Sequence, residues 1–560
     1  MKPLRIAFLW HFHQPDYLSH DEYILPWTRL HGVKDYFDFP EVFYDHPKIK
    51  QNINLVPSLV KQIENYSKGI YFDKVFNLSF INPEDLTQNQ KSDILINFFY
   101  CNKTNQIEKY ARFKELYEKS KSSNAVFEYQ DHDWVDLQVY YNLSWVGEFS
   151  KKNGICRRLL IKERNFSIVE RNELMTYHIE IIKKIIYQYQ TLSDLGQIEL
   201  SLSPFYHPIL PLLCNVKTAS EALSDLDLSA LEFSYPEDAK MQISKSIDYL
   251  RQFFPNKING IWSSEGSLSN EVLGIMLEMG FSWTASDEKI LSNSLHDLQS
   301  TDKYFPFKYI NNGKEINIFF RDNKLSDKIG FEYSKWNEND AVNDFIYELN
   351  EIRNQLERNH GADSLDQAVV TVVLDGENCW EYYKNNGVNF LNLFYNRLST
   401  PEFETVLFSD IKPAENSRIL DSIKAGSWIN GDFAIWISSK EAQIAWKLLA
   451  DARNEFEQTK NELDKQTYDE IYENLLIAEG SDWFWWYHST HHSELEPEFD
   501  LLFRNRLQTV YKLLNIKIPE ELLQPIGNYT KDSQALNNVN NQELATETNE
   551  NNSMHKTGNY

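Results

Sequence analysis

The chain of 560 residues is long enough for two or three domains, and its 42% hydrophobic content allows a sizeable core. Its 56 basic and 82 acidic residues give a net charge of −26, which repels nucleic acid and anionic membrane surfaces. We therefore expect no nucleic-acid or membrane partner, and the ligand need not carry a charge.

The cysteines show no metal-binding or redox motif, and the N-terminus shows no secretory signal. The four cysteines are scattered, and no CxxC pair predicts a zinc knuckle or a redox motif. The first apolar run ends at Trp10, which is too short for a secretory signal. No apolar stretch reaches the roughly 18 residues of a membrane span. We expect a cytoplasmic protein without cofactor or bound metal.

The N-terminus predicts a buried strand over residues 4–10 that runs into the sequence HFHQP (11–15). Strand alternation places His11 and His13 on one side of the chain, and Pro15 stops the strand. Residues 84–180 are polar and charged, with helix-like stretches such as 108–121, so they predict a helical insertion or layer.

Strands and helices alternate through the middle of the chain. We expect strands at 197–203, 258–262, 281–285, 316–320 and 369–374, with helices at 238–254, 270–278 and 339–356. This alternation predicts a parallel sheet, most simply a barrel. Nearly every strand ends in polar or charged residues, and active sites of such folds gather at that edge.

The character of the sequence changes after about residue 400. Amphipathic helices are expected at 440–457 and near 499–514. Residues 527–560 are rich in Asn, Thr and Glu, which predicts disorder. The expected domains are a barrel over 1–400, a helical region over 401–526 packed on it, and the disordered tail.

Two of the expected strands end near an acid. Glu265 follows the strand at 258–262, and Asp375 ends the strand at 369–374. A pair of carboxyl groups is what glycosidic bond cleavage requires. The spacing assigns no roles, because Glu377 competes with Asp375 as the second acid. Glu265 could equally cap the next helix, and Asp375 could be an ordinary turn residue.

The histidines support two different interpretations. His11 and His13 could bind zinc or iron if His207, with Asp375 or Asp287, completed the ligand set. In a sugar site, neutral imidazoles would instead donate hydrogen bonds to hydroxyl groups, and a purely structural pair of histidines is also possible.

The aromatic run 482–487 is followed by His488, His491 and His492. The aromatic side chains either pack the helical region against the barrel or form a wall for sugar stacking.

Together, these stretches resemble glycoside hydrolase family 57, with the amylopullulanase-like and α-amylase-like branch as the nearest. The resemblance covers nearly everything up to about residue 515. The blocks that carry it include HFHQP (11–15), LPWTRLHGVKDY (25–36), GQIELSLSPFYHPILPLL (196–213), GIWSSEGSLS (260–269), VVLDGENCWEYY (372–383) and SDWFWWY (481–487).

The resemblance implies an incomplete TIM-like (β/α)7 barrel with a C-terminal helical region, and a retaining mechanism on α-glucans such as starch, glycogen or maltooligosaccharides. It implies Glu265 as nucleophile and Asp375 as general acid/base, which favours Asp375 over Glu377. The residues it implies for substrate binding are His11, His13, His207, Trp262 and Trp380.

One departure and three alternatives stay open. After SDWFWWY the family generally carries Gly-Asp-Asp-His, whereas this chain has HSTH (488–491), so glucan specificity could differ. The alternatives are 4-α-glucanotransferase or branching-type transfer by the same residues, a zinc-dependent barrel hydrolase such as an α-mannosidase, and a non-catalytic glucan-binding protein. Linkage preference and oligomeric state are not predicted.

Overall fold

The computed structural model describes residues 2–152, 154–256, 258–412, 417–491 and 493–527. The predicted disordered tail, residue 527 apart, lies outside these residues. No helix within them combines the length and apolar character needed to cross a membrane.

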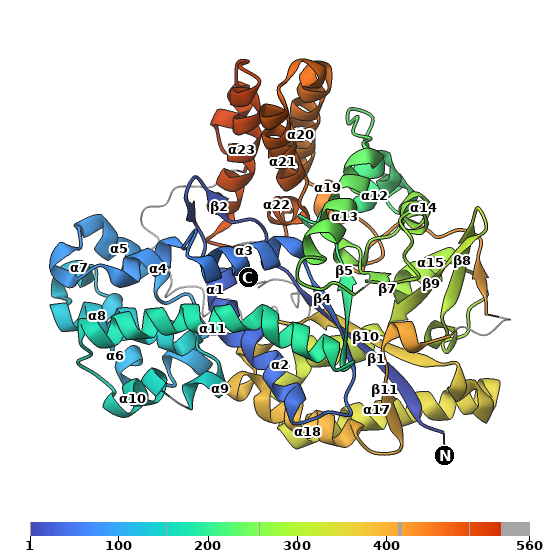
Figure 1. The fold of residues 1–560 in the computed structure, drawn as a ribbon, viewed down its shortest axis with the longest axis horizontal. Coiled ribbons are helices and arrows are strands. Elements are labelled where there is room, and N and C mark those ends of the chain that lie inside the picture. The colour runs from blue at the N-terminus through green and yellow to red at the C-terminus, as the bar shows by residue number, and fades with distance from the viewer. Residues whose placement is uncertain (1, 153, 257, 413–416, 492, 528–560) are drawn as a thin grey trace.

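A closed barrel of parallel strands forms the centre of the molecule (Figure 1). It closes where Thr371 of the last strand pairs with Arg321. This confirms the predicted incomplete (β/α)7 barrel. The strands in order around it are β10 (Val369–Asp375), β1 (Leu4–Phe12), β4 (Gln51–Leu55), β5 (Ile198–Leu202), β6 (Gly260–Ile261), β7 (Trp283–Asp287) and β9 (Lys314–Arg321).

Burial on both faces explains the sequence of β1. Eight of its nine residues are buried, as in a strand with neighbours on each side and helices outside. The strand pairs with β10 and β4, and it extends through Phe12, beyond the predicted end at residue 10. Its register with β10 sets His11 opposite Asp375, so the two predicted site strands end at the same level.

Strand β4 was not predicted, because its sequence QNINL looks like a polar loop. All five residues are nevertheless buried. Asn52 donates its amide N–H to the carbonyl of Phe8 at 2.9 Å, and Asn54 donates to the Ser201 hydroxyl at 3.0 Å. These amides occupy the barrel interior only because the neighbouring strands satisfy their hydrogen bonds.

Helices fill the long connection between β4 and β5, and Figure 1 shows most of them gathered beside the barrel. The longest, α11, begins at a capping box formed by Ser167 and Glu170. The main helices of this connection are α3 (Pro57–Lys68), α4 (Lys74–Phe80), α5 (Gln88–Asn97), α6 (Ala111–Ser120), α8 (Asp131–Trp145), α10 (Gly154–Lys162) and α11 (Ile168–Asp194).

Three helices confirm the predicted positions, with small shifts at their ends. The predicted helix at 270–278 is α14 (Asn270–Glu278), and that at 339–356 is α17 (Glu338–His360). The helix predicted at 238–254 is α13 (Pro236–Leu250), which precedes β6.

The C-terminal helices project from the barrel as a separate layer (Figure 1). This layer contains α20 (Lys440–Thr459), α21 (Lys465–Ala478), α22 (Ser481–Trp486) and α23 (Glu496–Leu513). Before it, β11 (Phe403–Thr405) pairs with β1, and β12 (Ile419–Leu420) pairs with β8 (Phe307–Asn311). The chain therefore still contributes to the sheet after residue 400, and the domain boundary placed there stays a prediction.

Candidate active site

The ends of four barrel strands, two on each side of β4, bring the predicted site residues to one rim. His11 and Asp375 are register partners on β1 and β10. His207 follows β5, and Glu265 follows β6, the next strand around the barrel. Because carboxyl ends of parallel strands meet at one edge, residues far apart in the sequence gather there.

A strained turn presents Glu265. It has a left-handed φ of 58° within the short helix η5 (Ser264–Gly266). Such a conformation costs on the order of 1–3 kcal/mol for a non-glycine residue and is concentrated at functional sites. Gly266 follows with φ 60°, and a Cβ there would lie 2.7 Å from the Trp262 ring. The next helix, α14, is capped by the Ser269 side chain, so Glu265 does not cap it.

Trp428 holds the Glu265 carboxyl group. Its indole Nε1–H donates to Glu265 Oε2 at 2.7 Å, and its backbone N–H donates to the Glu265 carbonyl at 2.9 Å. The Trp262 ring packs against Trp428 with ring centroids 5.3 Å apart. The Glu265 side chain is 14% exposed, so the carboxyl faces the site from a nearly enclosed position.

Both predicted catalytic carboxyl groups hold protons more tightly than usual. Burial, and then the negative charge of Asp375, raises the pKa of Glu265 to about 8, against the effect of the Trp428 hydrogen bond. Burial also raises the pKa of Asp375, while Asn378, His13 and Arg321 oppose it. Near neutral pH this pair therefore retains a proton, which acid catalysis needs.

Three histidine rings line the same rim. The His207 ring stacks on His13 at 3.9 Å and on His11 at 4.9 Å between centroids. Burial, with His13 as a second cause, lowers the pKa of His11 to about 3 and the pKa of His207 far below its usual value. His11 and His207 are therefore neutral and can hydrogen-bond without carrying charge.

The helical layer supplies the partners of these rings. His13 Nε2 contacts the two carboxyl oxygens of Asp482 at 2.9 and 3.0 Å. His207 Nδ1 lies 3.0 Å from the Ser481 hydroxyl, and His207 Nε2 has no hydrogen-bond partner among the described residues. Residues 481–482 at the start of α22 thus reach across to the barrel rim.

The acid that the structure groups with two of the predicted histidines is Asp482, which the metal-site hypothesis did not name. The ligand atoms of His13, His207 and Asp482 lie within 4.8 Å of one another. Asp287 instead accepts a hydrogen bond from the Lys289 backbone and lies 3.6 Å from Arg321. The rings of His13 and His207 are stacked with an interplanar angle of 23°. Imidazole binds a metal in the plane of its ring, and two stacked planes do not converge on one ion.

The predicted tryptophans lie behind the carboxyl groups. Trp262 is 0% and Trp380 is 1% exposed. Trp380 packs on Trp10, and its indole N–H donates to the Gly376 carbonyl at 2.7 Å. Both rings support the loops that carry Glu265 and Asp375, and their contact with substrate stays a prediction.

The aromatic run 482–487 mostly packs the helical layer. Trp483, Phe484, Trp486 and Tyr487 are buried, and only Trp485 of the run's aromatic residues is partly exposed. Trp485 stacks on His491 at 4.0 Å between centroids. The effect of the altered segment HSTH (488–491) stays a prediction, and the predicted His492 after it lies outside the described residues.

Sequence reasoning missed three supports of the site. Trp428 was overlooked, although a tryptophan between Gly426 and Gly431 in a loop was a usable signal. Asp482 was treated only as the start of an aromatic run. Asn54 contacts His11 Nδ1 through its Oδ1 at 2.7 Å, and it was missed together with the rest of β4.

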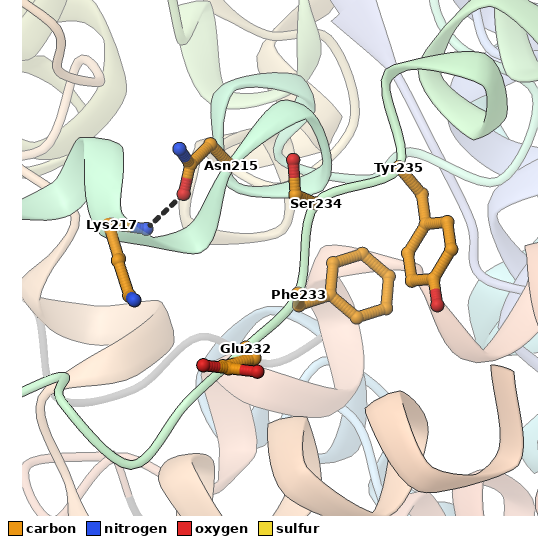
Figure 2. Close-up of a pocket in the computed structure, with 6 residues that line it drawn as sticks. All are labelled: Asn215, Lys217, Glu232, Phe233, Ser234 and Tyr235. Carbon is orange, nitrogen blue, oxygen red and sulfur yellow. Dashed lines mark hydrogen bonds between the residues drawn. The ribbon is translucent and has the colours of Figure 1, made fainter. Parts of the chain in front are cut away.

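A hollow on the surface contains none of the predicted site residues. Figure 2 shows it where α12 (Leu210–Cys214) ends and the chain approaches α13. The Asn215 side chain accepts a hydrogen bond from the Lys217 backbone there at 2.9 Å. The lining residues are Asn215, Lys217, Glu232, Phe233, Ser234 and Tyr235.

Solved structures with the same fold cover nearly the whole chain. A branching enzyme from Thermococcus kodakaraensis has a TM-score of 0.59 at 14% identity, with 94% of each chain covered. An α-amylase from Thermotoga maritima has a TM-score of 0.55 at 13% identity, covering 93% of this chain and 95% of that one. A 4-α-glucanotransferase from Thermococcus litoralis has a TM-score of 0.51 at 14% identity, covering 93% and 61%.

Among curated protein sequences, none matches the chain. The family model of glycosyl hydrolase family 57, by contrast, matches residues 7–421, a range that contains every predicted site residue. The chain therefore belongs to glycosyl hydrolase family 57.

Proposed function

We propose that this protein cleaves α-glucosidic bonds of α-glucans through a glycosyl-enzyme intermediate, as an α-amylase or amylopullulanase type of hydrolase. Glu265 attacks the anomeric carbon while Asp375 protonates the departing glycosidic oxygen. Asp375 then takes a proton from water, which attacks the anomeric carbon and releases Glu265. Net retention of configuration follows from the two displacements.

The Glu265 carboxyl group, fixed by Trp428 beside a second proton-holding acid at the barrel rim, is the observation that carries this proposal. The mechanism needs Glu265 ionised and Asp375 protonated. The Trp428 N–H favours the ionised form of Glu265, because a donor stabilises negative charge. The positive charge that develops on the sugar ring favours it further in the transition state.

Imidazole groups suit a sugar ligand, because their nitrogens exchange hydrogen bonds with hydroxyl groups. His207 Nε2 and His13 Nδ1 have no hydrogen-bond partner in the described part of the chain, and each can exchange a hydrogen bond with a sugar hydroxyl. The stacked rings support this role over zinc coordination, and the net charge of −26 accords with an uncharged polymer. Two acids at the rim also argue against a protein that only binds glucan.

Transfer is the second candidate function. In transfer, a sugar hydroxyl replaces water in the second step and the same two acids act. The 14% exposure of the Glu265 side chain favours this alternative, since a shielded intermediate excludes bulk water. The similar branching enzyme and glucanotransferase structures make transfer a reasonable outcome for this fold.

Variants that replace each catalytic carboxyl group by an amide test the proposal. Glu265→Gln and Asp375→Asn should each lower the release or transfer of glucose units from maltoheptaose by about 10³-fold or more, because each removes a group that acts in the transition state. Glu315→Gln, an exposed acid at the start of β9, is the matched control and should keep full activity. Full activity of Glu265→Gln would remove the assignment.

Product analysis then separates hydrolysis from transfer. Products longer than maltoheptaose would indicate transfer, whereas only shorter products would indicate hydrolysis. Maltotriose from pullulan would show cleavage of α-1,6 bonds, and digestion of glycogen would report action on a branched substrate.

A further inference from the structure

Glu377 lies two residues beyond Asp375, yet it faces the interior. It is 3% exposed, and its Oε1 accepts the backbone N–H of His13 at 3.1 Å and the Tyr36 hydroxyl at 3.3 Å. One carboxyl group therefore joins the loop after β10 to the end of β1. Asp375 is the last residue of β10, and His13 is the first residue after β1, so both lie at this junction.

A chain of buried hydrogen bonds ends at this carboxyl group. The Tyr17 hydroxyl donates to Gln14 Oε1 at 2.8 Å, and Gln14 Nε2 donates to the Tyr36 hydroxyl at 3.0 Å. Tyr36 in turn donates to Glu377. Tyr17, Gln14 and Tyr36 are all 0% exposed. Each donor in the chain is aimed toward Glu377, so the chain has a fixed direction and Glu377 is its acceptor.

The surroundings of Glu377 favour its neutral form. Its Oε2 is buried and has no hydrogen-bond partner among the described residues. Burial, with the nearby charges of Asp375 and Asp35, raises the pKa of Glu377 well above its usual value. An ionised group would add a further negative charge beside Asp375, which is costly in an interior.

We propose that Glu377 is a positioning residue for the reaction: as a neutral acid it ties the Asp375 loop to the His13 end of β1 and holds both at the spacing that the sugar requires. The inference rests on the proposed function, and it assigns a role to the acid that competed with Asp375. Glu377 acts through hydrogen bonds to neighbouring residues and transfers no proton to substrate.

Two substitutions separate the hydrogen-bond role from a charge role. Glu377→Gln keeps the oxygen acceptor and the neutral state, so kcat should stay within about threefold of wild type, with an unchanged basic limb of the pH profile. Glu377→Leu removes the acceptor. We expect kcat to fall by about 100-fold with a small change in KM, since a misplacement of about 1 Å costs that much.

Tyrosine variants test the same link with little risk to folding. Tyr36→Phe removes one donor and should lower kcat by about fivefold to tenfold, a fraction of the effect expected for Glu377→Leu. Tyr189→Phe is the matched control: Tyr189 packs on the same Phe12 ring as Tyr36, and its hydroxyl has no hydrogen-bond partner among the described residues. It should keep wild-type kcat.

The outcomes distinguish the inference from the proposed function. An inactive wild-type protein on every α-glucan would overturn both. With an active wild type, the inference alone fails if folded Glu377→Leu keeps its kcat. It also fails if Glu377→Gln loses as much activity as Glu377→Leu, or if the basic limb moves in Glu377→Gln. Should Glu377→Leu not fold, wild-type kcat in Tyr36→Phe overturns the inference.

Discussion

The two predicted catalytic carboxyl groups interact, because the charge of Asp375 is, after burial, the second cause of the raised pKa of Glu265. In such a pair the protons leave in two steps that belong to both groups. Burial and the charge of Asp375 raise the pKa of Glu265 to about 8. Below that pH the pair holds the one proton that the proposed mechanism uses.

We therefore expect kcat to fall as the pH rises above about 8. Both groups are then ionised, and the leaving oxygen receives no proton. Initial rates on maltoheptaose between pH 5 and pH 10 measure this limb. Some substrates have a leaving group that needs no protonation. For these, the rate of glycosyl-enzyme formation should fall less steeply as the pH rises. A rate that still rises at pH 9.5 would contradict the shared-proton account.

Trp428→Phe should lower kcat by about 10-fold to 100-fold. It removes the donor at 2.7 Å from Glu265, and hydrogen bonds to charged groups are worth roughly 1.5–3 kcal/mol. The proton shared by Glu265 and Asp375 would then lie more often on Glu265. A protonated Glu265 cannot attack the anomeric carbon. Trp336→Phe is a suitable control, since that ring is 44% exposed and packs on Tyr333. Equal kinetics for Trp428→Phe and wild type would show that the indole N–H is unimportant.

The roles of single residues could be predicted only in part from the sequence. Strand ends identified Glu265 and Asp375 as candidates, but a helix cap explained Glu265 equally well until Ser269 was seen to cap α14. Trp428 lies 163 residues from its partner Glu265. Such a contact depends on tertiary packing, which local patterns do not contain.

At the scale of elements, the loop after β10 is held close to β1. The backbone N–H of Gly376 donates to the His11 carbonyl at 2.8 Å, and a Cβ at Gly376 would lie 2.3 Å from the Phe12 ring. Phe12 is 0% exposed and packs on Tyr36 and Phe39. The ring has no room to retreat, so this position requires glycine.

Gly376→Ala should therefore destabilise the protein by about 1–3 kcal/mol and displace Asp375. Thermal unfolding and initial rates measure the two effects, and we expect the activity of the folded variant to fall by at least tenfold. Gly330→Ala is the control, because a Cβ there meets nothing within 4 Å. Wild-type stability and activity in Gly376→Ala would show that the loop is looser than the contacts imply.

Helices were predicted better than strands, and the reason is visible in two elements. The apolar positions of α17 repeat with helical period over 23 residues, so its position follows from the pattern alone. Strand β4 has five residues and three polar side chains, and only its neighbours in the barrel make it a strand. Short elements stabilised by tertiary partners escape local prediction.

At the scale of the whole molecule, the helical layer completes the rim. Ser481 and Asp482 of α22 contact His207 and His13. The barrel alone would leave these imidazoles without their partners. The layer is fastened to the barrel by Arg453 of α20, which forms an ion pair at 2.8 Å with the buried Asp238 of α13.

Arg453→Met should destabilise the protein by about 3–5 kcal/mol, because it leaves Asp238 buried without its cation. Chemical denaturation measures this loss. The double variant Arg453→Met/Asp238→Leu should recover part of it, since no buried charge remains. A loss below about 1 kcal/mol in the single variant would mean that this ion pair does not fasten the layer.

The most direct test of the central claim is to trap the glycosyl-enzyme. Asp375→Asn incubated with α-maltotriosyl fluoride should accumulate the intermediate, because fluoride leaves without an acid catalyst while the second step lacks its base. Peptide mass spectrometry should then find a maltotriosyl ester on Glu265. An adduct on any other residue, or initial products of inverted anomeric configuration, would contradict the account.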